Sequence, residues 1–523
     1  MRRDHTRCTA DEAIALIADD QTIACGGFVG ATHPEGLTAA LERRFLATGQ
    51  PRDLTLVYAA GQGDGKQRGL NHLGHEGLVR RVVGGHWGLA PRLGQLALAN
   101  KIEAYNFPQG VICQLFRDIA AGRPGCITHV GLDTFMDPIH QGGRLNDRTA
   151  PGAVERVTLG DRTWLWYKAF PIHVGLIRAS VADPHGNLLM NEEVIIGEGL
   201  AIAQAVHNSG GRVIAQVAKR LDAPAPPHQV AVPGVLVDAV VQARPEEHEQ
   251  TFAEPFNRAY VSPAPLTDDG SELEPLEAGA RRIIAARACN EVPAGAIANL
   301  GIGMPEGIAR IAAERGWLDR FTLTVESGPI GGMPAGGLSF GASVYPQAII
   351  DQPAQFDLYD GRALDFAALG AAQIDRHGNV NVSRFGTRLA GIGGFANITQ
   401  TARRLVFCGT FTAGGLEVDV VDGQLRIVRE GRCPKFVEDV EQLSFSARRS
   451  REVGQEVLFV TERAVFRLID VGLELIELAP GINLDRDVCA QMAFMPIVRN
   501  VKPMPAHVFE PFCPLRQATT EEV

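Results

Sequence analysis

Two stretches of the chain, IACGGFVGATHPEGLTAALERRF (23–45) and IANLGIGMPEGIARIAAERGW (297–317), decide its fold because they repeat one pattern. Each begins with a short apolar run, turns through glycines, passes Pro-Glu-Gly and continues with the apolar spacing of a helix. A second pair follows in the same order: ASVADPHGNLLMN (179–191) and GAAQIDRHGNVNVSRFG (370–386) share a His-Gly-Asn turn. Internal similarity of this kind indicates that the chain carries one fold twice.

The two copies differ in length. In the first, 151 residues separate Pro34 from His185, whereas 72 separate Pro305 from His377 in the second. The first half therefore carries roughly 80 additional residues. In both halves short apolar runs alternate with helical patterns, which favours βαβ units and a mainly parallel sheet. The sequence thus predicts an α/β protein made of two similar open α/β domains.

The length of the chain supports this division. A chain of 523 residues exceeds what one hydrophobic core fills, roughly 250–300 residues. Proline and acidic residues are frequent near 221–275, which predicts exposed connecting segments there. We place the first half at 1–250, a linker region at 251–278 and the second half, which carries Glu326, at 279–523.

Composition excludes several classes of protein. Hydrophobic residues make up 45% of the chain and charged residues 21%, which excludes a disordered chain, and the net charge of -10 argues against nucleic acid as a partner. The nine cysteines are scattered without a CxxC pair, so we predict neither structural zinc nor a disulfide scaffold. The N-terminal stretch indicates a helix and not a signal peptide, and no uncharged apolar run reaches 18 residues. We therefore expect a cytoplasmic protein without a membrane anchor.

Glycine-rich turns can offer backbone N–H groups to a ligand. In GIGMPEG (301–307) a strand leads through glycines into a helix start, where unpaired N–H groups bind negative oxygen. A second cluster, LAGIGGFANI (389–398), can present donors in the same way. Both stretches are also explained by tight turns alone. A dinucleotide fingerprint ranks below these interpretations, because G-x-G-x-x-G from Gly301 requires glycine where the chain has Glu306.

One carboxylate, Glu326, stands where the apolar run RFTLTV (320–325) meets a loop of glycine and proline. The corresponding strand of the first half reaches its loop with Ala60 to Gly63 and has no carboxylate there. A residue needed by the frame itself would occur in both copies, so Glu326 points to chemistry, as a base, a metal ligand or a nucleophile. No histidine or acid neighbours it at ligand spacing, and small neighbours with N–H donors suit a nucleophile that generates an oxyanion.

Five motifs in this order resemble the family I coenzyme A transferases, of the type in which both halves are fused. The resemblance runs from about residue 10 to 515 and is closest to the propionate or acetate (short-chain acyl) CoA-transferases. The motifs are CGGFVGATHPEG (25–36), NFPQGVICQLFRDIAAG (106–122), NLGIGMP (299–305), VESGPIGG (325–332) and GIGGFANI (391–398).

The resemblance implies a ping-pong reaction at an active site between the halves. Glu326 is expected to attack an acyl-CoA thioester, giving an acyl-glutamyl anhydride, and then to carry CoA as a glutamyl-CoA thioester until a second carboxylate takes it. Coenzyme A is implied as a substrate, with no cofactor or metal bound permanently, with acyl-CoA and small carboxylates as partners and with a homo-oligomer, dimer or tetramer. The residues expected to bind CoA or substrate are Gly301, Ile302, Gly303, Gly391, Gly393, Gly394 and Gln109.

Two alternatives stay open. One is an acyl-CoA hydrolase, in which water resolves the intermediate; the other is a phosphosugar isomerase or sensor of a related fold, by fold-level analogy. Around the glutamate the chain reads Val-Glu-Ser-Gly (325–328), whereas relatives with 3-oxoacid substrates read Ser-Glu-Asn-Gly, so donor preference is not carried over from them. His72, His75 and His86 are interpreted as helix-surface or loop residues in preference to metal ligands.

Overall fold

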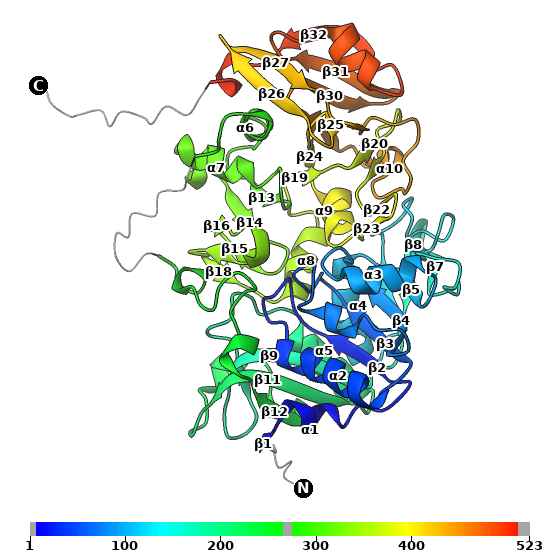
Figure 1. The fold of residues 1–523 in the computed structure, drawn as a ribbon, viewed down its shortest axis with the longest axis vertical. Helices are drawn as coiled ribbons and strands as arrows, with labels where there is room; N and C mark the ends of the chain where they lie inside the picture. Colours follow the sequence, from blue (N-terminus) through cyan, green and yellow to red (C-terminus); the bar gives the residue numbers. More distant parts are fainter. Residues whose placement is uncertain (1–6, 265–274, 511–523) are drawn as a thin grey trace, which may run out of the picture.

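The computed structural model describes residues 7–264 and 275–510, and its two halves lie end to end along the long axis (Figure 1). The first half contains an open sheet in the order β1-β12-β11-β9-β2-β3-β4-β5, in which all of these neighbours are parallel, and β10 pairs antiparallel with β9. The strands are β1 (Arg7–Cys8), β2 (Thr22–Cys25), β3 (Leu54–Tyr58), β4 (Val79–Gly84), β5 (Glu103–Asn106), β9 (Val174–Ala182), β10 (Leu188–Leu189), β11 (Arg212–Arg220) and β12 (Ala239–Gln242). The helices are α1 (Ala10–Ile14), α2 (Glu35–Thr48), α3 (Pro91–Leu98), α4 (Gln109–Ala120) and α5 (Gly199–Asn208).

The second half contains a mixed sheet in the order β18-β15-β14-β13-β19-β24-β29-β30-β31-β32, parallel from β14 to β29 and antiparallel at β15, β18, β30 and β31. These strands are β13 (Ile297–Leu300), β14 (Thr322–Thr324), β15 (Pro329–Ile330), β18 (Ala348–Ile349), β19 (Phe366–Gly370), β24 (Arg404–Cys408), β29 (Glu456–Val460), β30 (Ala464–Ile469), β31 (Gly472–Leu478) and β32 (Ile497–Pro503). The helices are α6 (Ala280–Cys289), α7 (Gly307–Glu314), α8 (Gln352–Asp360), α9 (Phe395–Thr401) and α10 (Ala447–Glu452).

Five small antiparallel two-stranded sheets complete the described part of the second half. They are β16 (Met333–Pro334) with β17 (Ser343–Val344), β20 (Gln373–Ile374) with β21 (Val380–Asn381), β22 (Arg384–Phe385) with β23 (Arg388–Leu389), β25 (Thr412–Ala413) with β28 (Cys433–Pro434), and β26 (Glu417–Val421) with β27 (Gln424–Arg429).

The predicted duplication is visible in the strand order. The parallel run β12-β11-β9-β2-β3 of the first half matches β29-β24-β19-β13-β14 of the second. The two His-Gly-Asn turns also match in detail, because Asp183 accepts hydrogen bonds from the N–H groups of His185 (2.8 Å) and Asn187 (3.0 Å), and Asp375 accepts the equivalent pair in the second half. The prediction of two similar open α/β units with mainly parallel sheets is confirmed.

The additional residues of the first half lie between β3 and β9. They supply β4, β5, α3 and α4, and a small antiparallel sheet of β6 (Gly125–Thr128), β8 (Arg162–Lys168) and β7 (Val154–Leu159). The second half has only short strands and α8 at the corresponding place, between β14 and β19. The insertion therefore widens the first sheet and extends the face of the first half toward the second.

The prediction that residues 221–275 form exposed connecting segments is wrong for part of that range. β12 lies inside this range, and its residues Ala239, Val240 and Val241 are buried because the strand lies in the sheet between β11 and β1. Phe252 is also buried, with its ring centroid 6.2 Å from that of His33 and 4.1 Å from the Arg68 guanidinium. Residues 265–274 lie outside the described residues, and the domain limits 1–250, 251–278 and 279–523 stay a prediction.

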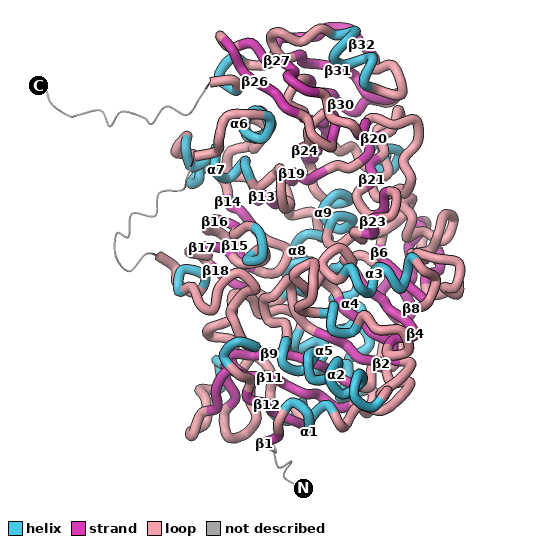
Figure 2. The backbone as a smooth tube through the Cα atoms, viewed as in Figure 1, coloured by secondary structure: helices cyan, strands magenta, loops and turns pink. Residues whose placement is uncertain are grey.

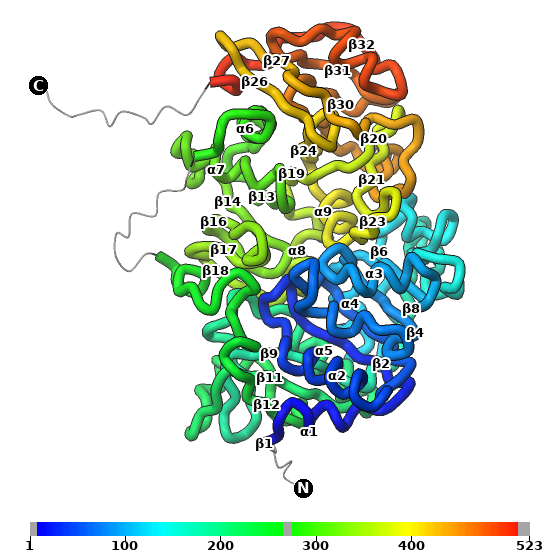
Figure 3. The backbone as a smooth tube through the Cα atoms, viewed as in Figure 1, coloured from blue at the N-terminus to red at the C-terminus, as the bar shows by residue number. Residues whose placement is uncertain are grey.

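One buried hydrophobic cluster runs through both halves and joins them. Helices α8 and α9 of the second half lie at the junction, next to α4 of the first (Figures 2 and 3). The helices approach closely at Gly110, where a Cβ atom would lie 2.5 Å from the Phe356 ring. The halves are therefore fitted together by packing that leaves no room for a larger residue at this point.

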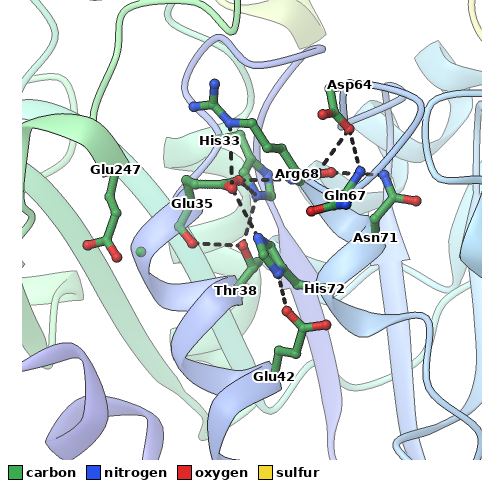
Figure 4. A network of polar contacts seen from close by, with 12 residues as sticks. His33, Glu35, Thr38, Glu42, Asp64, Gln67, Arg68, Asn71, His72 and Glu247 are labelled. Carbon is green, nitrogen blue, oxygen red and sulfur yellow. Dashed lines mark hydrogen bonds and ion pairs between the residues drawn. The ribbon is translucent and has the colours of Figure 1, made fainter.

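A network of ionised side chains ties α2 to the loop that follows β3 (Figure 4). His72 forms ion pairs with Glu35, at 3.0 Å, and with Glu42. Burial favours a lower pKa for His72, but its hydrogen bonds to these two carboxylates and their charges outweigh burial and raise the pKa. For Glu35 the shift is in the opposite direction. Burial favours a higher pKa, but His72, His33 and the Gly69 N–H outweigh it and lower the pKa to about 2. The network holds the Pro-Glu-Gly segment at the start of α2.

We expect His72→Gln to destabilise the protein by roughly 1–3 kcal/mol, because the buried Glu35 and the half-buried Glu42 lose a charged donor. A group whose pKa is raised on folding contributes stability that is fully present below its unfolded pKa and lost as the pH rises through its folded pKa. The loss in thermal midpoint should therefore be largest at pH 6 and shrink by pH 9. The exposed His140 provides the control, His140→Gln, which should change little at either pH. An equal loss for His72→Gln at both pH values would contradict this account.

Candidate active site

A cavity of about 280 Å³ lies between the two halves, and Glu326 stands in its wall. The first half lines it with residues that follow β2, β3 and β4 and with the start of α4. The second half contributes residues from the ends of β13 and β19, residues that follow β13 and β14, and the loop before α9. Seven of the eight residues predicted from the sequence line this cavity: Glu326, Gly301, Ile302, Gly391, Gly393, Gly394 and Gln109. Gly303 does not; it is exposed, and its carbonyl accepts a hydrogen bond from Arg281 at 3.0 Å.

Glu326 follows β14 after one residue and is half-buried at the cavity surface. The amide of Asn299, on the neighbouring strand β13, donates to its Oε2 at 3.3 Å. Burial raises the pKa of Glu326, and the hydrogen bonds from its own backbone N–H and from Asn299 oppose that rise. The loop beyond it is held tightly, because Gly328 has φ +131° and a Cβ there would lie 2.1 Å from the Ile350 carbonyl oxygen. The Asn299 hydrogen bond and the closely packed loop thus fix the carboxylate in position.

The strand registers place this carboxylate on one half only. Ile23 pairs with Leu56 in the first sheet, and the equivalent Ile297 pairs with Thr322 in the second. Four residues beyond each partner the chain has Ala60 in the first half and Glu326 in the second. The first half therefore has the methyl group of Ala60 at the position where the second half has the carboxylate of Glu326.

The loop 391–394, which we call the glycine loop, is bound to the first half through its backbone. Gly393 donates to the Gly85 carbonyl at 2.8 Å and accepts from the Gln109 N–H at 2.9 Å, and Ile392 donates to Asn106 Oδ1 at 2.9 Å. Gly391 has φ +81°, and a Cβ there would lie 2.9 Å from the Trp87 nitrogen. Only glycine can make this approach without displacing the neighbouring backbone.

These contacts change which N–H groups can serve a ligand. Gly301 donates to Ala368 (2.8 Å) and Gly391 to Ser383 (2.9 Å), so their N–H groups, like that of Gly393, are already used within the protein. The prediction that they act as donors to an oxyanion is therefore wrong. Within the described residues, the N–H groups of Ile302 and Gly394 have no hydrogen-bond acceptor. Gly394 adjoins the carboxylate, since a Cβ on it would lie 3.5 Å from Glu326 Cγ.

Three polar side chains at the cavity hold buried atoms without a hydrogen-bond partner in the described part of the chain. They are Asn299 Oδ1, Gln109 Nε2 and His86 Nδ1. Burial, with the charge of Arg388, lowers the pKa of His86 to about 4, so its ring is neutral near pH 7. Sequence reasoning found Gln109 but missed the other two. Asn299 opens the NLGIG motif and could have been singled out, whereas nothing near His86 in the sequence indicates the cavity.

Most of the remaining lining is apolar. Side chains from both halves form it: Phe28, Val29, Leu89, Phe340, Leu369, Val382, Ile392, Phe395 and Ile398. Among the described residues that line the cavity, Glu326 is the only acid and there is no lysine or arginine. The site thus presents one carboxylate, a few neutral polar groups and an apolar wall.

His72 and His75 bind carboxylates, Glu35 and Glu42, as described for the network above and through the 2.7 Å contact of His75 with Glu42. Across residues 7–264 and 275–510 there is no cluster of three or more His, Cys, Asp or Glu that could hold a metal ion. In the same residues no helix has the length and apolar character needed to cross a membrane.

Comparison with known proteins identifies the family. A model of the family "Coenzyme A transferase" matches residues 7–243. The chain is 42% identical over 495 residues to acetate CoA-transferase YdiF of Escherichia coli (strain K12), covering 94% of this chain and 92% of that protein. It is also 42% identical over 512 residues to caffeate CoA-transferase of Acetobacterium woodii, covering 96% of this chain and 97% of that one.

Solved structures give the same result for the fold. The crystal structure of the acyl-CoA transferase (YdiF) apoenzyme from Escherichia coli O157:H7 superposes with a TM-score of 0.92 at 39% identity, covering 98% of this chain and 97% of that chain. Its thioester complex with CoA gives a TM-score of 0.91 at 40% identity, covering 97% of this chain and 96% of that one. The family predicted from the five motifs is confirmed, and the chain belongs to the coenzyme A transferases, in the form that fuses both halves in one polypeptide.

Proposed function

We propose that this enzyme moves coenzyme A between monocarboxylic acids whose acyl chains are uncharged and apolar, of the acetate and propionate type, with Glu326 as the nucleophile. The observation that carries the proposal is Glu326 itself, the single acid in a cavity built from both halves. The raised pKa makes it a more basic and hence stronger nucleophile than an exposed glutamate.

The reaction proceeds by ping-pong in two exchanges. The Glu326 carboxylate attacks the thioester carbonyl, the C–S bond breaks, and an acyl-glutamyl anhydride and CoA thiolate form. The thiolate then attacks the glutamyl carbonyl, which releases the first carboxylate and leaves a glutamyl-CoA thioester. An incoming carboxylate reverses both steps and leaves as the new acyl-CoA. Each exchange passes through an oxyanion, for which the Gly394 and Ile302 N–H groups are the available donors, each worth about 10²–10³ in rate.

The lining of the cavity supports monocarboxylates as substrates. A second carboxylate on the acyl group would lose its water against Phe28, Leu89 and Phe340 and would find no cation among the lining residues. An uncompensated buried charge of this kind costs several kcal/mol. The same lining offers no cation to a phosphosugar. Coenzyme A is a substrate in this scheme, and the cytoplasmic location and the homo-oligomer stay predictions.

Incubation with propionyl-CoA and no acceptor should leave CoA bound covalently to the peptide that contains Glu326, detected by mass spectrometry after digestion. Glu326→Gln should abolish the adduct and lower the transfer rate by roughly 10³-fold or more. Glu438→Gln, which removes an exposed carboxylate of the same half, should do neither. Full activity without an adduct in Glu326→Gln would exclude the mechanism, and release of CoA without any carboxylate acceptor would indicate a hydrolase.

Asn299→Ala should lower kcat by about 10–10²-fold, because Glu326 loses the amide that orients it. The hydrogen bond from Asn299 lowers the pKa of Glu326, so its removal should raise that pKa and move the acidic limb of the kcat profile to higher pH. The profile is measured beside that of Asn290→Ala, which changes an exposed asparagine at the end of α6. An unchanged acidic limb in Asn299→Ala would show that the amide does not act on the nucleophile.

Butyrate and succinate test the acceptor class. They have the same number of carbons, but where butyrate ends in a methyl group succinate has a second carboxylate. We expect kcat/KM for butyrate to exceed that for succinate by at least about 10²-fold, from the cost of burying the second charge. The rates are compared with one acyl-CoA donor at fixed ionic strength. Comparable values for the two acids would overturn the assignment to monocarboxylates.

A further inference from the structure

A second, larger cavity of about 890 Å³ lies between the halves and shares no lining residue with the catalytic cavity. Its walls are the β7–β8 hairpin of the first half and, from the second half, α10 and the C-terminal ends of α8 and α9. The two cavities lie at opposite ends of α9, since the glycine loop precedes this helix and Gln400, near its end, lines the larger space. We call this space the arginine cleft, because it is lined by Arg156, Arg162, Arg362, Arg448 and Arg449.

The carboxylates around the cleft leave part of this positive charge uncompensated. Arg448 is paired with Asp133, at 2.5 Å, and with Glu452, at 3.2 Å, and Arg449 is paired with the same Glu452, at 3.4 Å. Arg162 and Arg362 have no carboxylate within ion-pair distance among the described residues, although Arg362 donates to the Val453 carbonyl at 3.5 Å. The remaining ion pair, of Arg156 with Asp137, is long at 3.5 Å. The cleft therefore holds a surplus of guanidinium groups.

Two other titratable groups in the cleft, His129 and Asp360, add little charge near neutral pH. His129 has its pKa lowered to about 4, first by burial and then by the charges of Arg449 and Arg362. Asp360 has its pKa raised to about 7 by burial, so it cancels less than one unit of positive charge near neutral pH. Arg156, Arg162, Arg362 and Arg448 are exposed and Arg449 is half-buried, and all five line one space, so their charges act together on a ligand placed in it.

The cleft also offers a neutral donor and an aromatic surface. Trp164 on β8 has its indole N–H buried, with no acceptor in the described part of the chain. The His129 ring lies beside it, with centroids 6.4 Å apart. Guanidinium groups bind phosphate oxygens through paired N–H donors, and an aromatic ring provides a face for a planar base. A volume of about 890 Å³ is large enough for a ligand of nucleotide size.

We propose that the arginine cleft binds an anion that carries two or more phosphates, of nucleoside diphosphate size. Arg162 and Arg362 bind the phosphates from opposite halves of the protein, and Trp164 contributes its N–H and ring. Such a ligand has two sources, a free nucleotide or the adenosine phosphate end of a second CoA molecule, and both present the same chemistry to the cleft.

Titration calorimetry on the full chain tests this site with ADP, pyrophosphate and adenosine. We expect ADP and pyrophosphate to bind and adenosine to bind at least about 10-fold more weakly, with affinity falling as salt rises. The double variant Arg162→Ala/Arg362→Ala removes the two guanidinium groups without carboxylate partners, so no acid is left unpaired and the fold should persist. The double variant should bind ADP at least about 10-fold more weakly, whereas Arg426→Ala, which changes an exposed arginine outside the cleft, should leave ADP affinity unchanged.

A parallel titration with CoA in Glu326→Gln distinguishes the two sources. If CoA binds Glu326→Gln at two sites and loses one of them when Arg162→Ala/Arg362→Ala is added, the cleft binds CoA. If CoA binding is unchanged by the added substitutions, the cleft binds a free nucleotide. The proposal is overturned if ADP shows no binding at millimolar concentration, if adenosine binds as tightly as ADP, or if the double variant, folded by its thermal midpoint, binds ADP as the native chain does. None of these results depends on transferase activity.

Discussion

The backbone hydrogen bonds between the glycine loop and the first half are the constraint on which the rest of the site depends. Gly393 donates to Gly85 and accepts from Gln109, so one residue of the second half is bonded both to the loop after β4 and to the start of α4. These bonds place Gly394 against Glu326 and at the same time bring Gln109 and His86 to the cavity wall. The site therefore belongs to neither half alone; it is formed where main-chain hydrogen bonds of the glycine loop join the second half to the first.

Duplication supplied the frame and divergence supplied the chemistry. Each half retains the parallel strand order and the His-Gly-Asn turn, whose aspartate accepts the same pair of N–H groups in both copies. The halves differ where function requires it: the second has Glu326 where the first has Ala60, and the first has an insertion that brings its surface to the glycine loop.

Features that depend on residues close together in the sequence could be predicted from it, and features that depend on contacts between distant residues could not. The strand–turn–helix repeat and the isolated position of Glu326 are local patterns, and the duplicated fold was predicted from them correctly. The availability of N–H donors was not, because Gly393 bonds to a carbonyl more than 300 residues away. Phe252 was assigned to an exposed segment for the same reason, since its partners His33 and Arg68 are remote. His86 carries no local signal for the cavity, whereas Asn299 opens the NLGIG motif, whose glycines mark the turn and not the asparagine.

The apolar surroundings of Glu326 have opposite effects on the successive states of the proposed reaction. The resting carboxylate is penalised, as its raised pKa records, and the Asn299 amide offsets only part of that cost. In the anhydride and in the glutamyl-CoA thioester the side chain is neutral, so the same surroundings impose no such penalty on them. Burial therefore narrows the free-energy gap between the stable resting enzyme and its reactive intermediates, and excluding water protects those intermediates from hydrolysis. The apolar lining that disfavours a charged acyl group therefore also favours the neutral thioester in which Glu326, a weak nucleophile, carries coenzyme A.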